Sequence, residues 1–195
     1  MVIYKLKSNW KVNKKERGID NKSYKELALQ DIHIFVKTRF TEVKKSKKIK
    51  DLVSFQTTNK FLIMAHSQEE LKILGRIVAS NNKNNLSEVL IEYEEHLNLA
   101  LECIPTTKTH SNVLMHIFGF FSNEFSILER DKFFELQNDF KNEKITIGEI
   151  LAKINPTIFR FNKTYLTSQT YFLLYSNPDP RNIFKILKKE EELKL

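Results

Sequence analysis

Residues 67–80 read SQEELKILGRIVAS, a stretch that carries both a helix start and a helix face. Ser67 and Glu70 have the spacing of a capping box, in which the Ser hydroxyl and the Glu carboxylate each accept a backbone amide of the first turn. Leu71, Leu74 and a valine one turn further on then follow at the spacing of one helical face. The pattern predicts an amphipathic helix whose apolar side needs a partner.

The same capping pattern recurs along the chain, each time before apolar residues at helical spacing. The further pairs are Ser23 with Glu26, Ser126 with Glu129, and Thr146 with Glu149. Apolar stripes of helical spacing also occupy residues 52–66 and 90–101. Only four Gly and four Pro occur in 195 residues, too few for the many tight turns of an all-β domain. We therefore expect an all-α protein, a compact irregular bundle of about six to eight helices.

The chain divides into three expected segments. Residues 1–22 lack clear periodicity and are expected to form an N-terminal arm, residues 23–180 a helical domain, and residues 181–195 a charged helical tail. Pro105 is expected to end or kink one helix, and Pro156 to kink a later one. No apolar run reaches the ~18 residues of a membrane span. The N-terminus also lacks a secretory signal, so we expect a soluble, cytoplasmic protein without a membrane partner.

The formal net charge of +8 favours nucleic acid or another polyanion as a partner. Abundant Lys and Asn also fit the codon usage of an AT-rich genome, so clustering is more informative than the total. The densest cluster is VKKSKKIK at residues 43–50, which contains Lys44, Lys45, Lys47, Lys48 and Lys50. Most such runs are only solvated, but like charges this close repel one another unless a polyanion or salt screens them. Phosphate binding here requires the cationic side chains to form one face.

The stretch THSNVLMHIFGFF at residues 109–121 places polar residues among bulky apolar ones. In a structural interpretation, Asn112 and His116 make hydrogen bonds within the helical core, and Gly119 lets another helix approach closely. In a functional interpretation, His110 and Asn112 point outward at a ligand near the helix start. Free amides and Lys108 would favour a phosphate there.

The five histidines provide little support for catalysis or metal binding. His110 and His116 are six residues apart, about 120° around a helix, and cannot hold one ion together. We expect no metal site and no cofactor, and the single cysteine, Cys103, excludes an internal disulfide or iron–sulfur site. No nucleophile motif or Gly-rich phosphate loop is present. An enzyme acting on a nucleotide or modified base, with His66 or His116 as general acid or base, is therefore the weaker class.

Aromatic residues gather in TYLTSQTYFLLYSNP at residues 164–178. Tyr165 and Tyr171 have the spacing of core residues, yet exposed they would offer stacking surfaces for unpaired bases. Gln169 between them could hydrogen-bond a base edge. Both interpretations remain open from the sequence.

Four short motifs in fixed order resemble the YbgA-like helical domain family over about residues 50–178. They are FLIMAHS at 61–67, LGRIVA at 74–79, THSNVLMHIFGFF at 109–121 and YLTSQTYF at 165–172. Members of that family occur alone or fused to a TudS-type desulfidase domain, whose cysteines hold an iron–sulfur cluster. The fused proteins are associated with removing sulfur from 4-thiouridine in tRNA, and the helical domain is credited with grasping the RNA.

The resemblance implies that this chain is an RNA-binding, and specifically tRNA-binding, module that acts with a separate desulfidase partner. The expected RNA contacts combine the lysine cluster with matching motif positions: Lys44, Lys45, Lys47, Lys48, Lys60, His66, Ser67, Arg76, Lys108, His110, Asn112, Tyr165, Gln169 and Tyr171. The chain departs from the family at Gln56 and Asn59, where members often carry histidines. A protein adaptor that docks one helical face on a partner enzyme is a third hypothesis.

Overall fold

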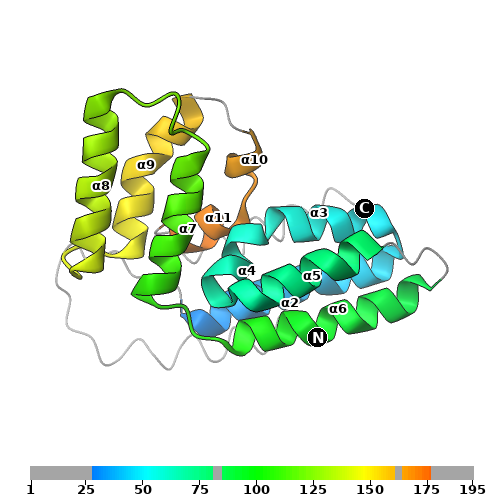
Figure 1. Ribbon diagram of the computed structural model, residues 1–195. Coiled ribbons are helices and arrows are strands. Elements are labelled where there is room, and N and C mark those ends of the chain that lie inside the picture. The colour runs from blue at the N-terminus through cyan, green and yellow to red at the C-terminus, as the bar shows by residue number, and fades with distance from the viewer. Residues whose placement is uncertain (1–27, 81–84, 161–163, 177–195) are drawn as a thin grey trace, which may run out of the picture.

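The computed structural model describes residues 28–80, 85–160 and 164–176, and all regular structure in these ranges is helical (Figure 1). In chain order the helices are α2 (Leu29–Ser46), α3 (Ile49–Thr58), α4 (Lys60–His66), α5 (Gln68–Ser80), α6 (Leu86–Glu102), α7 (Thr107–Gly119), α8 (Ile127–Lys141), α9 (Ile147–Arg160), α10 (Thr164–Thr167) and α11 (Thr170–Tyr175). Eight of these ten have seven or more residues, so the prediction of an all-α bundle is confirmed. The predicted arm at 1–22, the tail at 181–195 and the Ser23–Glu26 pair lie outside the described residues.

The predicted helix starts at Ser67, Ser126 and Thr146 are real. Ser126 Oγ accepts the Glu129 amide, and the Glu129 carboxylate accepts the Ser126 amide at 2.9 Å. The carboxylate three residues after Thr146 accepts the Thr146 amide at 2.7 Å in the same way. Ser67 Oγ accepts the amide three residues on at 3.2 Å. The capping pattern therefore located three helices correctly.

The apolar stripe over residues 52–66 is divided between α3 and α4, which meet at Asn59. The Asn59 backbone lies at φ −100° and ψ 5°, and its side-chain amide donates to the Phe55 carbonyl at 2.8 Å. Pro105 lies after the end of α6, as predicted, and Pro156 lies inside α9, where the kink was expected. The stripe was thus a correct sign of helix but gave no warning of the break.

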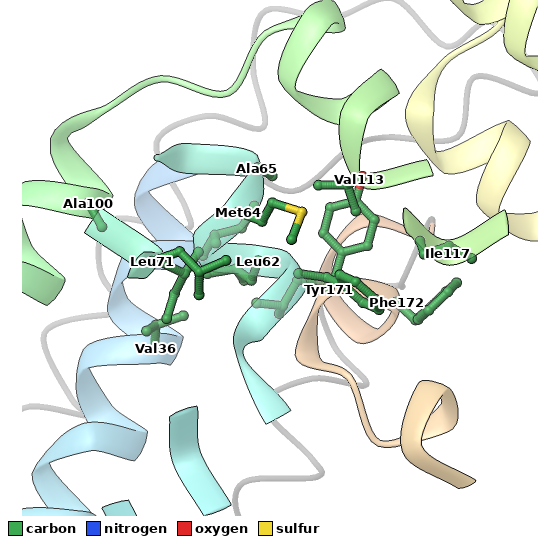
Figure 2. Packing of buried hydrophobic residues seen from close by; sticks show 14 of the residues in the cluster. Val36, Leu62, Met64, Ala65, Leu71, Ala100, Val113, Ile117, Tyr171 and Phe172 are labelled. Carbon is green, nitrogen blue, oxygen red and sulfur yellow. The ribbon is translucent and has the colours of Figure 1, made fainter. Parts of the chain in front are cut away.

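Helix α4 is the centre of the core, because every residue from Phe61 to His66 is buried. A helix that is apolar on all sides needs neighbours on all sides, and α4 packs against α5, α6, α7 and α11. Figure 2 shows Met64 of α4 close to Val113 of α7 and to the ring of Tyr171 from α11. The core therefore joins helices that are distant in sequence.

The helices form two groups around this centre. Helices α2, α3, α5 and α6 lie together at one end of the molecule and α7, α8 and α9 at the other, as Figure 1 shows. The turn that joins α2 to α3 lies at the end farthest from α7 and α8. None of the described helices combines the length and hydrophobicity that a transmembrane segment requires.

Candidate functional site

A cluster of polar side chains lies inside the core where α4, α6, α7 and α11 meet. His66 Nδ1 lies 2.8 Å from the Cys103 carbonyl oxygen, which follows the end of α6. Because a carbonyl only accepts, Nδ1 must donate, which leaves His66 Nε2 to accept from the Tyr175 hydroxyl at 3.4 Å. His110 Nδ1 and the Tyr171 hydroxyl share a 2.8 Å hydrogen bond. The cluster links α4, α7, α11 and the end of α6.

Burial controls the protonation of these groups. It lowers the pKa of His66 from 6.5 to about 4, with His33 adding a smaller electrostatic contribution in the same direction. Burial also lowers the pKa of His110 to about 4, again with a smaller contribution from His66. The pKa of the Tyr171 hydroxyl is raised well above its ordinary value by the same cause. At neutral pH both imidazoles are therefore uncharged hydrogen-bonding groups.

His33 joins the cluster from α2, and nothing in the sequence singled it out. Its ring centre lies 5.4 Å from that of His66. Its Nε2 atom is buried and has no hydrogen-bond partner among the described residues. Its pKa is lowered, first by burial and then by Lys37.

His66 and His116, the two catalytic candidates, do not converge. His66 is 3% exposed at the end of α4, whereas His116 is exposed in the last turn of α7. The imidazole nearest to His66 is that of His33, and His110 is linked to His66 through Tyr175, whose ring centre lies 4.9 Å from the His110 ring. Within the described ranges, no group of three or more His, Cys, Asp or Glu side chains could hold a metal ion.

The Gln169 side chain bonds backbone groups on both sides of the break between α3 and α4. Its Oε1 accepts the Phe61 amide at 3.4 Å, and its Nε2 donates to the Thr57 carbonyl at 2.8 Å. These are an amide of the first turn of α4 and a carbonyl of the last turn of α3, groups that helix ends leave without an intrahelical partner. Gln169 is 1% exposed, so its amide is used inside the protein.

The remaining motif residues are divided between packing and surface. Tyr165 is half-buried against Phe61, with ring centres 6.2 Å apart, and against the partly exposed Phe120 at 5.4 Å. Ser67 is the half-buried cap of α5, and Lys60 and Arg76 are exposed on α4 and α5.

The expected role of Gly119 is wrong. A Cβ atom built on Gly119 would have no neighbour within 4 Å, so no second helix approaches there. Gly75 of α5 does face a neighbour, since a Cβ there would lie 3.9 Å from Gln56 Nε2 on α3. Gln56 also accepts the hydroxyl of the buried Tyr93. Gln56, where the family resemblance implies a histidine, therefore makes a structural hydrogen bond in this chain.

The lysine cluster lies at the turn between α2 and α3 and is largely free. Lys44 is the exception, because its ammonium lies 2.6 Å from the Glu94 carboxylate of α6 and 5.8 Å from the centre of the Phe40 ring. The other four lysines of residues 43–50 are exposed, and none of them forms an ion pair with a described residue. Lys47 has φ 50°, a left-handed conformation that favours glycine.

Lys108 and Asn112 lie elsewhere, in a cleft between α7 and α8 with a volume of about 450 Å³. The residues that line it are Thr107, Lys108, Ser111, Asn112, Met115, Gln137 and Lys141. No pattern in the sequence pointed to Lys141, because it is contributed by the next helix. The expected basic residues thus do not form one continuous face: the lysines of residues 43–50 and Lys108 lie at opposite ends of the molecule (Figure 1), and Lys60 and Arg76 lie on α4 and α5.

The structure defines the class of this protein as all-α, with a buried histidine–tyrosine cluster and two separate basic surfaces. Residues 60–176, more than half of the chain, match the family described as "Protein of unknown function (DUF1722)", and the chain belongs to that family. It is also 26% identical over 125 residues to "Uncharacterized protein YbgA" of Escherichia coli (strain K12), which covers 64% of this chain and 74% of the relative. The YbgA-like resemblance is therefore confirmed. No solved structure matches the chain.

Proposed function

We propose that this protein binds RNA, with tRNA as the expected class, through the lysines at the turn between α2 and α3. The observation that carries the proposal is the exposure of Lys45, Lys47, Lys48 and Lys50 around the junction of α2 and α3, without an acidic partner among the described residues. Neighbouring ammonium groups repel one another, and phosphates would relieve that repulsion.

The backbone at Lys47 favours this interpretation over ordinary solvation. A left-handed residue at the end of a helix is most often glycine, and a side chain there costs on the order of 1 kcal/mol. Lys47 occupies this conformation with φ 50° at the end of α2. The turn therefore keeps a cation at a position where glycine would be more stable.

Lys44 contributes less to this surface than its neighbours. Its 2.6 Å ion pair with Glu94 already satisfies the ammonium, and the pair links α2 to α6. Exposed pairs of this kind add at most about 1 kcal/mol to stability. RNA phosphates are consequently expected to contact Lys45, Lys47, Lys48 and Lys50.

The tRNA assignment and the partner come from the family resemblance. The resemblance implies a TudS-type desulfidase as the partner. That partner must be a separate chain, because an iron–sulfur site needs several cysteines and this chain has only Cys103. The buried, neutral state of His66 gives no support to acid–base catalysis by this chain at neutral pH. We therefore assign it binding and no reaction.

A filter-binding titration of unmodified tRNA at several salt concentrations tests the proposal. The logarithm of affinity is expected to fall linearly with the logarithm of salt, with a slope near −3 for about four phosphate contacts. Binding that is absent, or that does not change with salt, would remove the basis of the proposal.

A further inference from the structure

We propose that the cleft between α7 and α8 is a separate site for a phosphate monoester carried by a ligand of nucleotide size. The site does not depend on RNA binding at the turn between α2 and α3, since the two lie at opposite ends of the molecule. Its volume of about 450 Å³ falls within the range of small-molecule pockets.

The charges around the cleft favour an anion. Lys108 in the first turn of α7 and Lys141 in the last turn of α8 both line it, and no Asp or Glu is among its lining residues. Two ammonium groups from different helices can contact one dianionic phosphate from two directions. The sequence separation of these lysines means that folding alone brings them together.

The start of α7 adds backbone donors to the lysines. Thr106 and Thr109 form a reciprocal capping box, which satisfies the Thr109 amide at 3.2 Å. The amides of Thr107 and Lys108 precede it in the first turn, where no carbonyl of the helix can accept them. Both residues line the cleft. Free amides at a helix start attract phosphate oxygens.

An unpaired buried hydroxyl is the independent sign of a ligand. Ser111 lines the cleft and is 7% exposed, yet its Oγ has no hydrogen-bond partner among the described residues. A buried hydroxyl without a partner is costly, so such groups mark sites that a ligand or water completes. The Oγ atom is enclosed in this structure, so the proposal includes a change of the Ser111 side chain to another staggered rotamer, from which the hydroxyl donates to an oxygen in the cleft.

The wall opposite Ser111 is fixed in place. Gln137 of α8 is 4% exposed, and its side-chain amide donates to the Ser111 carbonyl at 3.3 Å. This bond holds α8 against the first half of α7 and so keeps the two lysines on either side of the opening. Met115, which is 41% exposed, supplies an apolar edge suited to a base or another flat group. A mononucleotide therefore fits the chemistry better than phosphate alone.

Titration of the protein with inorganic phosphate, AMP and adenosine, followed by amide chemical shifts, tests the proposal. We expect saturable binding of AMP, weaker binding of phosphate at the same amides near Thr107 and Ser111, and no binding of adenosine. Replacing both cleft lysines, Lys108→Gln with Lys141→Gln, should weaken AMP binding at least about tenfold. Lys72→Gln with Lys153→Gln removes the same charge from exposed positions elsewhere and should leave it unchanged.

Ser111→Ala separates a ligand contact from a structural role. Because the hydroxyl has no partner in the folded protein, its removal should leave the melting temperature unchanged or higher while AMP affinity falls several-fold. Equal weakening by both lysine pairs, binding of adenosine as tight as AMP, or no binding of AMP or phosphate would each overturn the proposal. The site is expected to persist when the lysines between α2 and α3 are replaced, so its failure is distinguishable from failure of RNA binding.

Discussion

The buried cluster around His66 and the lysine turn between α2 and α3 were both predicted as RNA-contacting surfaces, yet they differ in every physical respect. In the cluster, imidazole and phenol groups are buried and bonded to one another or to backbone carbonyls. In the turn, four ammonium groups are exposed without an acidic partner among the described residues. Polar residues in an apolar motif thus join helices here, whereas these four lysines form no ion pair with a described residue.

The largest expected effect of this difference is on stability as the pH falls. His66 and His110 have a pKa of about 4 in the folded protein and an ordinary value of 6.5 when unfolded. Between these pH values the unfolded chain binds more protons than the folded protein. The contribution of the two histidines to the free energy of unfolding is therefore fully present above pH 6.5 and is lost as the pH falls toward 4. Each histidine should contribute on the order of 3 kcal/mol to that loss. Urea unfolding at a series of pH values measures it.

Single variants assign the pH effect to the cluster. His66→Gln and His110→Gln should each start less stable and show a smaller loss between pH 6.5 and 4. His116→Gln removes an exposed imidazole and leaves the cluster intact, so it should keep the full loss. A full loss in the two cluster variants would show that other groups cause the acid sensitivity.

The next largest effect is expected at the break between α3 and α4. Gln169→Leu removes the acceptor for the Phe61 amide and the donor for the Thr57 carbonyl, and it leaves both backbone groups unpaired in the core. The free energy of unfolding should fall by about 2–4 kcal/mol. Gln68→Leu, at an exposed position at the start of α5, should change it by less than about 0.5 kcal/mol. Equal effects of the two variants would contradict the bridging role of Gln169.

The smallest expected change in the free energy of unfolding is that of a variant at Lys47. Stability and tRNA binding should change in opposite directions in this variant. Lys47→Gly relieves a left-handed side-chain conformation and should raise stability by up to about 1 kcal/mol while weakening tRNA binding. Glu143 has a similar φ of 57° after α8, so Glu143→Gly should stabilise the protein without weakening the complex. Calorimetry and filter binding of both variants check the pair. Unchanged tRNA affinity in Lys47→Gly would assign Lys47 to the solvated surface.

Most of the fold could be predicted from local patterns, because capping and apolar spacing are local properties of a helix. Ser126 and Thr146 marked helix starts correctly for that reason. The break at Asn59 could not be predicted, since it depends on Gln169, more than one hundred residues away in the sequence. Only tertiary packing brings that side chain to the unpaired Phe61 amide and Thr57 carbonyl at the two helix ends.

The candidate sites were less predictable for the same reason. His110 was open to both a buried and an outward interpretation, and its 2.8 Å bond to Tyr171 depends on how α7 meets α11. Lys108 and Asn112 were recognised near a helix start, but the cleft they line also needs Lys141 of α8. By contrast, the run of lysines in residues 43–50 could be recognised from the sequence alone. Residues that are close in sequence are also close in space at a surface turn.

The measurement that tests the lysine turn most directly is the salt dependence of tRNA binding in two charge-matched triple variants. Lys45→Gln, Lys48→Gln and Lys50→Gln together should reduce the magnitude of the slope by about 2 to 3. Lys37→Gln, Lys72→Gln and Lys153→Gln remove the same charge from other exposed positions and should leave the slope unchanged. Equal slopes in the two triple variants would contradict a specific role for the turn between α2 and α3.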